Sequence, residues 1–295
     1  MATKPVVVGV DGSEESLQAV EWAALEAKRH SSPLRIVSAP ALVPRVHAYN
    51  ASPSTIANAL RGISARALEA AITRCEEVAP GLPVTTSLLS GPPALAVAES
   101  GSGASVLVVG ARGAGGFAAM VLGSVSSYVA SRAACPVVVV REETMAVHRE
   151  IAVGIRDPQE TGEALAFAFE EAALRRAELV AVHAWFWFPS ALHLPAKGEA
   201  AELRPTNPDE ISAEAASSLA AALEGWQDKY PGVKVRRDII HGHPARVLAS
   251  YAARADLIVL GRHSHPGGAG PGIGSIQHAV LDHAHGPVAV VPSRG

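Results

Sequence analysis

The stretch Val106-Leu-Val-Val-Gly110-Ala-Arg-Gly113 runs from four aliphatic residues into a glycine-containing loop. Successive aliphatic residues are typical of a strand that is buried on both faces, as in a parallel sheet covered by helices. A second copy, Leu257-Ile-Val-Leu-Gly261, lies 151 positions later. Because glycine allows a sharp turn and a close backbone approach, both copies indicate a strand that leads into a turn and a helix.

The duplication extends over the whole chain. Val7-Val-Gly-Val-Asp11 aligns with Ala152-Val-Gly-Ile-Arg156 at an offset of 145 positions. Pro136-Val-Val-Val-Val140 aligns with Pro287-Val-Ala-Val-Val291 at an offset of 151. Matches in the same order with one change of offset indicate a duplicated domain with a small insertion, which we place in 185–208. We predict a first domain over residues 1–143 and a second over residues 149–295.

Each half alternates strand-like and helix-like segments. This alternation predicts βαβ units with right-handed crossovers and helices on both faces of a parallel sheet. The predicted fold is therefore α/β, with two tandem doubly wound, Rossmann-like domains. Ser13 is expected to cap the first helix. In the first half the predicted strands cover 5–10, 34–39, 83–89, 105–110 and 136–141, and the predicted helices cover 13–30, 54–79, 92–100 and 124–134.

Composition limits the function classes. The 295 residues are 48% apolar and 18% charged, which excludes wholesale disorder. A net charge of −3 argues against binding of nucleic acid or anionic membranes through bulk positive charge. Two cysteines cannot form a disulfide framework, and no apolar run approaches the ~18 residues of a membrane span. With no signal-like N-terminus, we expect a soluble cytoplasmic protein.

Glycines and a serine follow the fourth predicted strand. Gly110 and Gly113 lie in the loop, and Gly123-Ser124 opens the next helix. Ligands of doubly wound sheets bind at the carboxyl ends of the strands, and helix N-termini favour phosphate. This arrangement predicts a site for a di- or triphosphate, although such glycines can also serve only a tight strand-to-helix connection. It is neither a Walker A sequence nor a strict dinucleotide fingerprint.

Asp11 follows the first predicted strand, which is expected at the centre of the sheet. Because its carboxylate would repel a triphosphate, we expect it near ribose hydroxyls or the amino group of a base. The alternative role is to cap the helix that starts near Ser13, and the two roles are compatible.

Three motifs together resemble the ATP-binding universal stress protein family. They are the opening Val8-Gly-Val-Asp11-Gly-Ser13, the spacing Gly110-x2-Gly113-x9-Gly123-Ser124, and the closing Cys135-Pro136-Val-Val-Val-Val140. The resemblance covers essentially the whole chain, because each half by itself is similar to one domain of the family. The sequence is thus similar to the tandem universal stress proteins of actinobacteria.

This resemblance implies a five-stranded parallel sheet in each half, with ATP or AMP in a cleft and Mg²⁺ beside the triphosphate. It implies that Asp11 contacts the adenosine end and that the backbone of Ala39 contacts adenine. It also implies pairing through the last strand, so we expect an internal pseudo-dimer of the halves and a homodimer of the chain. The residues expected to hold ribose and phosphates are Gly110, Gly113, Gly123, Ser124 and Val125, with Arg112 as the cation of the same loop.

The second half departs from this pattern. Gly261 and Gly274-Ser275 survive and are candidate binding residues, but Ser264 replaces Gly113 and Arg156 replaces Asp11. A guanidinium cannot accept the hydrogen bonds that a carboxylate accepts. The second site has either lost or weakened adenine nucleotide binding, or it binds ATP or another anion in an altered pose through Arg156. We favour loss or weakening because of the charge reversal.

Histidines gather near the expected ligand edge of the second half. His241, His243, His263 and His265 follow predicted strands and could bind a transition metal. No acidic or cysteine partner has matching spacing. We therefore predict no metal-ligating residues.

The function that these features favour is nucleotide-dependent regulation in a stress response, with ATP in the first domain. ATP would shift the population of conformations through the 111–122 loop and so signal to an unidentified protein partner. One alternative is a slow ATPase or adenylyl-transferring enzyme, which needs a charge-stabilising cation such as Arg112 and a residue that positions water. No general base is apparent, so we predict no catalytic residues. The other alternative is a chaperone-like scaffold that ignores nucleotide.

Overall fold

The computed structural model describes residues 3–40, 52–113, 122–141, 147–156, 161–186, 208–262 and 273–293. Most of the expected insertion and most of the segment that joins the halves lie outside these residues. The domain boundaries at 143 and 149 therefore stay a prediction. Among the described residues, none of the helices combines the length and the apolar character that a membrane span requires.

The first half forms a five-stranded parallel sheet, with strands and helices close to the predicted ranges. Its elements are β1 (Val6–Gly9), α1 (Glu14–Arg29), β2 (Leu34–Ser38), α2 (Pro53–Val78), β3 (Val84–Leu88), α3 (Pro93–Ser100), β4 (Val106–Gly110), α4 (Ser124–Arg132) and β5 (Val137–Val140). The strand order is β3-β2-β1-β4-β5, and every neighbouring pair is parallel. The order reverses between β1 and β4, which is where this type of sheet binds ligands.

The second half repeats this arrangement, with one additional short helix. Its elements are β6 (Glu150–Gly154), α5 (Gly162–Arg175), β7 (Glu178–Trp185), α6 (Pro208–Leu223), α7 (Trp226–Lys229), β8 (Val235–His241), α8 (Pro244–Tyr251), β9 (Leu257–Arg262), α9 (Ser275–His283) and β10 (Val288–Pro292). The order β10-β9-β6-β7-β8 is again parallel throughout and reverses between β6 and β9.

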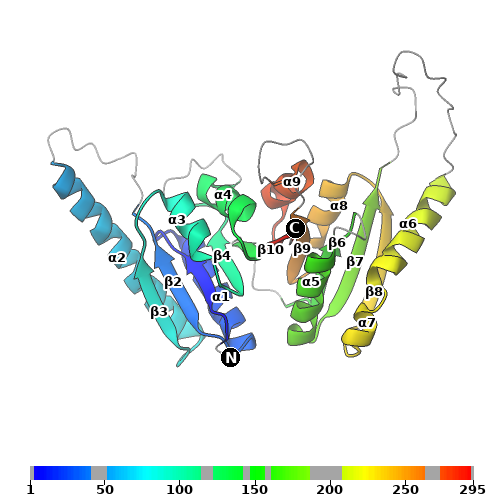
Figure 1. Cartoon of the computed structure of the whole chain (residues 1–295), viewed down its shortest axis with the longest axis horizontal. Coiled ribbons are helices and arrows are strands. Elements are labelled where there is room, and N and C mark those ends of the chain that lie inside the picture. Colours follow the sequence, from blue (N-terminus) through cyan, green and yellow to red (C-terminus); the bar gives the residue numbers. More distant parts are fainter. Residues whose placement is uncertain are drawn as a thin grey trace, which may run out of the picture.

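The last strands of the two halves join the sheets. β5 and β10 pair in antiparallel orientation, with Val139 opposite Val288 and Val137 opposite Val290. The result is one continuous ten-stranded sheet in which the two halves lie side by side, joined at its centre by β5 and β10 (Figure 1). The two tandem Rossmann-like domains are confirmed, and the halves form the expected internal pair. The homodimer of whole chains stays a prediction.

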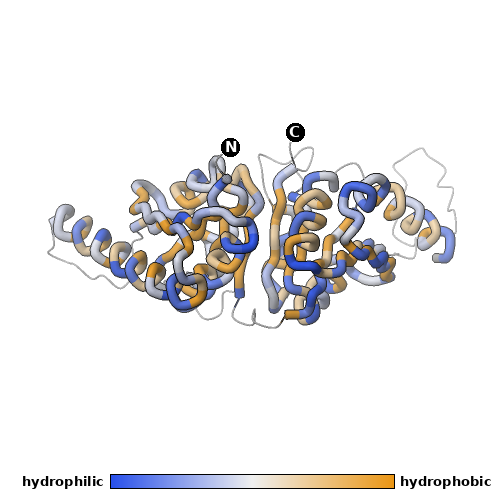
Figure 2. The backbone as a smooth tube through the Cα atoms, turned by 90° about the horizontal axis from the view of Figure 1, so that it is seen from below, coloured by the Kyte–Doolittle hydropathy of each residue, from blue (hydrophilic) through white to orange (hydrophobic). Residues whose placement is uncertain are grey.

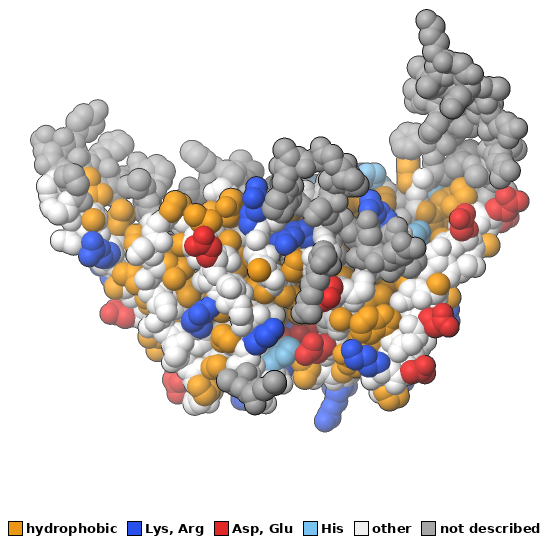
Figure 3. Space-filling view, viewed as in Figure 1, with side chains coloured by type: hydrophobic (Ala, Val, Ile, Leu, Met, Phe, Trp, Pro, Cys, Tyr) orange, Lys and Arg blue, Asp and Glu red, His pale blue; other side chains and the backbone are white. Residues whose placement is uncertain are grey.

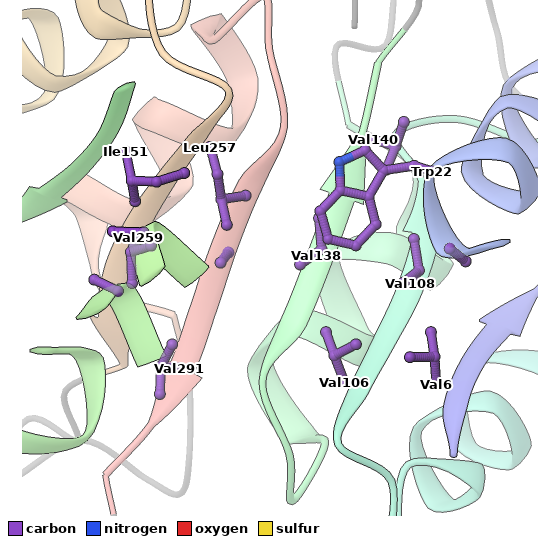
Figure 4. Packing of buried hydrophobic residues seen from close by; sticks show 14 of the residues in the cluster. Val6, Trp22, Val106, Val108, Val138, Val140, Ile151, Leu257, Val259 and Val291 are labelled. Atoms are coloured by element: carbon purple, nitrogen blue, oxygen red, sulfur yellow. The ribbon is translucent and has the colours of Figure 1, made fainter. Parts of the chain in front are cut away.

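Helices cover both faces of the sheet, which explains the aliphatic strands. Side chains from α1, α2, α5 and α6 pack on one face, and those from α3, α4, α8 and α9 pack on the other. Along β5, Val138 and Val140 join the first cluster, whereas Val137 and Val139 join the second. Figure 4 shows Val138 and Val140 beside Trp22 on one side of the junction, with Val259 and its neighbours on the other.

The hydrophobic residues concentrate in the strands at the centre of the molecule, and hydrophilic residues lie mainly on the outer surfaces of the helices (Figure 2). On the face shown in Figure 3, acidic and basic side chains are interspersed. Burial of a valine side chain contributes roughly 1.5 kcal/mol or more to folding. The buried aliphatic side chains of the short strands can therefore stabilise the sheet. The residues that follow the carboxyl ends of the strands are not needed for this core.

Candidate functional site

The predicted first-half residues meet at one edge of the sheet. Gly9 lies opposite Val37 of β2 and opposite Val109 of β4 in parallel register. Two residues beyond these positions, the chain reaches Asp11, Ala39 and Ala111. Parallel strands end at the same edge, so the carboxyl ends of β1, β2 and β4 form the floor of the candidate site.

Asp11 lies against the glycine loop and the start of α1. A Cβ atom at Gly113 would overlap the Oδ2 atom of Asp11, so any other residue there would push the end of the Asp11 side chain aside. The other oxygen, Oδ1, accepts hydrogen bonds from the backbone N–H of Ser13 at 3.0 Å and from its hydroxyl at 2.6 Å. Ser13 in turn accepts a bond from the N–H of Ser16 at 3.2 Å as the N-cap of α1. The predicted Ser13 cap is confirmed, with Asp11 supporting it.

Gly110 has a packing role that the sequence motif did not reveal. A Cβ atom at this position would lie 2.7 Å from the carbonyl oxygen of Glu15 and 3.1 Å from the backbone nitrogen of Ser16. Both are backbone atoms of α1 that cannot swing away. Gly110 therefore allows α1 to approach β4. Its own carbonyl oxygen accepts a bond from the buried hydroxyl of Ser126 at 2.6 Å, a contact that sequence reasoning missed.

The start of α4 offers unpaired backbone donors toward the same edge. Gly123 is the N-cap, with φ −72° and ψ 153°, and forms no side-chain capping bond. Its N–H donates to the carbonyl oxygen of Ala111 at 2.8 Å, which ties the helix start to the end of β4. Ser124 is exposed and Val125 is half-buried. N–H groups in the first helical turn lack partners within the helix and attract anions. Residues 114–121 of the loop lie outside the described residues.

Arg112 is held by α1. Its Nη2 atom lies 3.0 Å from Oε1 of Glu15, and the side chains are 35% and 20% exposed. This ion pair partly neutralises the guanidinium of Arg112. Arg112 would therefore have to release Glu15 before its whole guanidinium could bind a phosphate.

Ala39 lies beside the end of β1, and its expected contact with adenine stays a prediction. It is 8% exposed and directly follows Ser38, whose hydroxyl donates to the carbonyl oxygen of Val10 at 2.8 Å. This bond holds the ends of β1 and β2 together. The structure thus brings together all the predicted first-half residues that it describes.

The second half has a cavity at the equivalent edge. It measures about 240 Å³, with mainly aliphatic walls. Its lining includes Arg156, Gly261, Gly274 and Ser275, so the surviving glycines and the replacing arginine come together. Ser264, His263 and His265 lie outside the described residues.

The helix that bounds this cavity is anchored by a different side chain. Gln277 donates from Nε2 to the carbonyl oxygen of Gly261 at 2.8 Å, as Ser126 does to Gly110 in the first half. Gln277 also lines the cavity, and its Oε1 atom would lie 2.5 Å from a Cβ atom at Gly274. A longer side chain therefore occupies part of the space near the helix start.

The two described histidines of the second-half group contact aromatic rings. His241 packs against Trp185 with ring centroids 4.6 Å apart and stacks on Phe186 at 6.1 Å. His243 is the N-cap of α8 and lies edge-on to Phe186 at 6.4 Å. These contacts give both imidazoles a packing role beside the cavity.

A buried charged cluster that sequence reasoning missed lies between the halves. Nε2 of His30 on α1 lies 3.0 Å from Oε1 of Glu26 and 3.0 Å from Oε1 of Glu171 on α5. Arg175 contacts both carboxylates, at 2.7 Å and 3.2 Å. Glu26 and Glu171 are equivalent at the offset of 145, as are His30 and Arg175. The repeat alignment contained this signal, because a glutamate recurs on the buried face of each helix.

The cluster changes the protonation of its members. Burial opposes the charge of Glu26, but Arg175 and His30 overcome it and hold the pKa of Glu26 well below its usual range. Burial and the charge of Glu26 raise the pKa of Glu171 to about 7. Burial opposes the charge of His30, yet hydrogen bonds to Glu171 and Glu26 raise its pKa to about 10.

Three ligand atoms of this cluster, from Glu26, His30 and Glu171, lie within 4.8 Å of one another, as in a metal site. However, Arg175 is already bound to the carboxylates, and His30 is held in its protonated form. A divalent cation would have to displace both positive charges. The residues therefore fit an ion cluster that joins α1 to α5 better than a metal site.

The whole chain is similar to proteins of one known family. The model of the Universal stress protein family matches residues 2–141 and again residues 148–292. A universal stress protein of Mycobacterium tuberculosis (strain ATCC 25618 / H37Rv) is 35% identical over 301 residues, covering 97% of this chain and 96% of that protein. One from Mycolicibacterium smegmatis is 32% identical over 299 residues, covering 98% and 97%.

The fold also resembles a solved structure of the same kind. The crystal structure of a universal stress protein from Archaeoglobus fulgidus DSM 4304 superposes with a TM-score of 0.70 at 17% identity, covering 99% of this chain and 97% of that chain. At this identity the likeness concerns the fold alone. The two family matches and the full-length relatives carry the assignment, and the chain belongs to the universal stress protein family, as a tandem of two family domains.

Proposed function

We propose that the chain binds an adenine nucleotide, ATP or AMP, in its first half and acts as a nucleotide-dependent regulator in a stress response. The observation that carries this proposal is the meeting of Asp11, Gly113 and the uncapped start of α4 at the switch point of the sheet. A carboxylate can bind ribose hydroxyls or a base amino group, while free N–H groups bind phosphate. The two ends of a nucleotide thus have separate partners.

The backbone of Ala39 and the hydroxyl of Ser124 complete the proposed contacts. Ala39 lies beside the end of β1, where adenine would lie if Asp11 binds the ribose. Ser124 is exposed at the first position of α4, so its hydroxyl can donate to a phosphate oxygen. Val125 and the N–H groups of the same turn would contribute to the phosphate site.

Mg²⁺ is compatible with this assignment. Magnesium usually keeps several waters and is held by substrate phosphates with one or two carboxylates. In the described part of the first-half site the carboxylates are Asp11 and Glu15, and Glu15 is paired with Arg112. Phosphate oxygens and waters would therefore supply most of the ligands of the Mg²⁺ ion. The bound ion would also screen the negative charge of the triphosphate from Asp11.

For the second half we propose weakened or altered nucleotide binding. Its cavity keeps Gly261, Gly274 and Ser275 but places Arg156 at the position of Asp11 and Gln277 near the helix start. Arg156 cannot accept bonds from ribose hydroxyls. An anion bound through Arg156 is the alternative for this cavity.

The regulatory mechanism follows from binding alone. A nucleotide shifts a conformational equilibrium only by as much as its affinity differs between the two states. We propose that the changed state is read by a protein partner, with the chain acting in the cytoplasm as a homodimer. Slow hydrolysis is the less favoured function, because Arg112 is engaged with Glu15.

The direct test is mass spectrometry of the denatured purified protein, followed by titration calorimetry with ATP and AMP. Two variants should lose binding. Gly123→Val fills the helix start, and its backbone conformation (φ −72°, ψ 153°) allows valine. Ser124→Asp places a negative charge where phosphate would bind, although an acidic first turn favours the helix itself.

The expected result is binding of adenine nucleotide to the wild type and at least a ~10-fold loss in both variants, equivalent to about 1.4 kcal/mol. Absence of bound nucleotide and of binding heat in the wild type would overturn the proposal. Release of phosphate over many turnovers, abolished by Arg112→Ala, would favour the enzyme instead. Retention of client-protecting activity without nucleotide would favour the scaffold.

A further inference from the structure

One arginine of the second half holds the end of a first-half helix. Arg262, the last residue of β9, donates from Nη1 to the carbonyl oxygen of Ala133 at 2.8 Å and to that of Ala130 at 3.4 Å. These carbonyls lie at the C-terminal end of α4. Carbonyl groups at a helix C-terminus lack partners in the helix and carry partial negative charge, so a guanidinium both satisfies and attracts them.

An arginine of the first half does the same in the opposite direction. Arg141 directly follows β5 and donates from Nη2 to the carbonyl oxygens of Leu281 and Asp282. These lie in the last turn of α9. In Figure 1, α4 and α9 lie on the two sides of the β5–β10 junction, which is why one residue can span from each half to the other.

The helices held in this way are the ones that begin at the two candidate sites. α4 begins after Gly123, and α9 begins after Gly274. Each has nine residues and is therefore about 13 Å long. A helix this short moves as a rigid rod, so a shift of its C-terminal end also shifts the N–H groups at its start.

The arginines also stand next to the sites of their own halves. Arg262 directly follows Gly261, which lines the second-half cavity and accepts the bond from Gln277. Arg141 directly follows Val140, whose carbonyl oxygen accepts a bond of 2.9 Å from the N–H of Ala111 in the first-half loop. Each guanidinium thus connects the strand end at one site to the helix that serves the other.

We propose that Arg262 and Arg141 are positioning residues that couple the two candidate sites. Arg262 fixes the start of α4 according to the state of the second-half cavity, and Arg141 fixes the start of α9 according to the state of the first-half loop. Coupling between two binding equilibria is reciprocal, so each ligand changes the affinity for the other by the same factor. The inference rests on the proposed function for the identity of the first-half ligand.

The two bridges are separable because they are not copies of one another. At the offset of 151, Arg262 corresponds to Ala111 and Arg141 corresponds to Pro292. Each direction of coupling therefore depends on one side chain and can be removed alone.

The first experiment titrates ATP with Mg²⁺ into full-length variants. Arg262→Gln is expected to weaken binding about 5-fold, because the loss of the charged hydrogen bonds to Ala130 and Ala133 loosens α4 and with it the helix start. Arg262→Lys should restore part of the affinity. The matched control is Arg132→Gln. Arg132 ends α4, is exposed and lies over the ring of Tyr128. The Arg132→Gln substitution removes one positive charge at the same end of α4 but leaves the contacts of Arg262 and Arg141 intact. Nucleotide binding should therefore change less than 2-fold. An equal loss in the two variants would overturn the proposal.

The second experiment follows hydrogen exchange in the first turns of both helices. In the wild type, ATP should slow exchange at residues 124–128 and also at residues 275–279. In Arg141→Gln the first effect should remain and the second should disappear. Ser124→Asp, which blocks the first-half site, should abolish both effects. If protection at 275–279 survives in Arg141→Gln or in Ser124→Asp, ATP acts there without the bridge and the proposal fails.

Failure of the proposed function gives a different result. If the wild type binds no adenine nucleotide, that function is overturned, and the bridge is then tested without ligand. Arg262→Gln should exchange faster than Arg132→Gln at residues 124–128, while the buried strand β5 exchanges equally in both. Equal exchange at 124–128 would overturn the positioning role as well.

Discussion

The two halves are alike where they touch one another and unlike at the sheet edges where we propose that ligands bind. At the junction, Glu26 and Glu171 occupy equivalent positions of α1 and α5 and are both almost fully buried. At the sheet edge, Asp11 of the first half is replaced by the exposed Arg156 in the second. A buried carboxylate needs its partners in both copies, since an unpaired buried charge is costly. An exposed residue can change sign at little cost to folding.

The junction also contains one unequal pair. The cations at equivalent positions are His30, whose charge can be lost, and Arg175, whose charge is permanent. The second half thus supplies the buried fixed charge of the cluster, whereas the first half supplies the titratable His30 and the more exposed Arg29, which contacts Glu26 at 3.0 Å. Four predictions test this difference between the halves, first at the junction and then at the sites.

The largest effect is expected from Arg175→Ala. Its removal leaves Glu26 and Glu171 buried side by side, with only His30 and the partly exposed Arg29 as cationic partners. Breaking a buried ion pair typically costs about 3–5 kcal/mol. Urea unfolding should show this loss in the free energy of unfolding. The matched control is Arg236→Ala on β8, whose side chain is 38% exposed and bonds three carboxylates. Exposed pairs contribute about 1 kcal/mol or less. Similar losses in the two variants would refute the special role of the junction.

The next effect is on the pH dependence of stability. The pKa of His30 is raised from 6.5 to about 10, so its contribution is complete below pH 6.5 and is lost as the pH rises to about 10. The pKa of Glu171 is raised to about 7, so its contribution is also lost as the pH rises, from about 4.5 to about 7. The pKa of Glu26 is lowered, so its contribution is lost only in acid, below pH 4.5. Stability should therefore be highest near pH 4.5 and should fall as the pH rises above it, first through Glu171 and then through His30.

His30→Gln separates these contributions. The wild type should lose roughly 2–4 kcal/mol between pH 6.5 and pH 10 in urea unfolding, because the folded state binds the proton more tightly than the unfolded state. The variant should be less stable at pH 6 and should show a much flatter profile over the same range. An unchanged alkaline slope in His30→Gln would assign the pH dependence to other groups.

At the sites, the exchange of charge predicts unequal mutational effects. Asp11→Asn should weaken ATP binding to the first half about 10-fold, because an amide accepts hydrogen bonds less strongly than a carboxylate. Arg156→Gln, at the equivalent position, should change total adenine nucleotide binding less than 2-fold. Calorimetry on both variants measures this ratio. A larger loss in Arg156→Gln would place the principal nucleotide site in the second half.

The smallest effect is expected when the first loop is made to resemble the second. Gly113→Ser introduces the residue of position 264, and its Cβ atom must push Asp11 aside. We expect about 3-fold weaker ATP binding with little loss of stability, since Asp11 is only half-buried. When Gly113→Ser is combined with Asp11→Asn, it should weaken ATP binding further by less than 3-fold, because the effects of substitutions at contacting residues are not additive. Gly62→Ser on α2, where a Cβ atom would make only an ordinary contact of 3.7 Å with the side chain of Arg66, is the control. Fully additive effects would show that the two residues act independently.

Much of the fold could be predicted from the sequence. The strand β4 was expected at 105–110 and is found at Val106–Gly110, and α4 was expected from residue 124 and begins there. Such elements follow from local patterns: aliphatic runs for strands, and glycine, serine or proline at helix starts. The candidate site could be located for the same reason, because the edge of a parallel sheet follows from the order of its strands.

The contacts within the site could not be predicted in the same way. The sequence motif treats Gly110 and Gly113 alike, yet a side chain at Gly110 would meet the backbone of α1, whereas one at Gly113 would meet the side chain of Asp11. Arg112 was identified as a cation of the loop, but its pairing with Glu15 depends on how α1 packs on β4. These are distances between segments far apart in the sequence, and no local pattern encodes them.

The sequence by itself determined that this chain is a duplicated α/β protein whose first copy keeps a complete glycine and serine motif and whose second copy does not. Local periodicity and internal repetition suffice for this, because each βα unit forms from neighbouring residues. The tertiary structure decided the antiparallel register in which β5 pairs with β10, that Glu26 meets Arg175, and that Arg262 reaches the end of α4. These contacts join residues more than a hundred positions apart, and only the packing of the two halves into one sheet brings them within bonding distance.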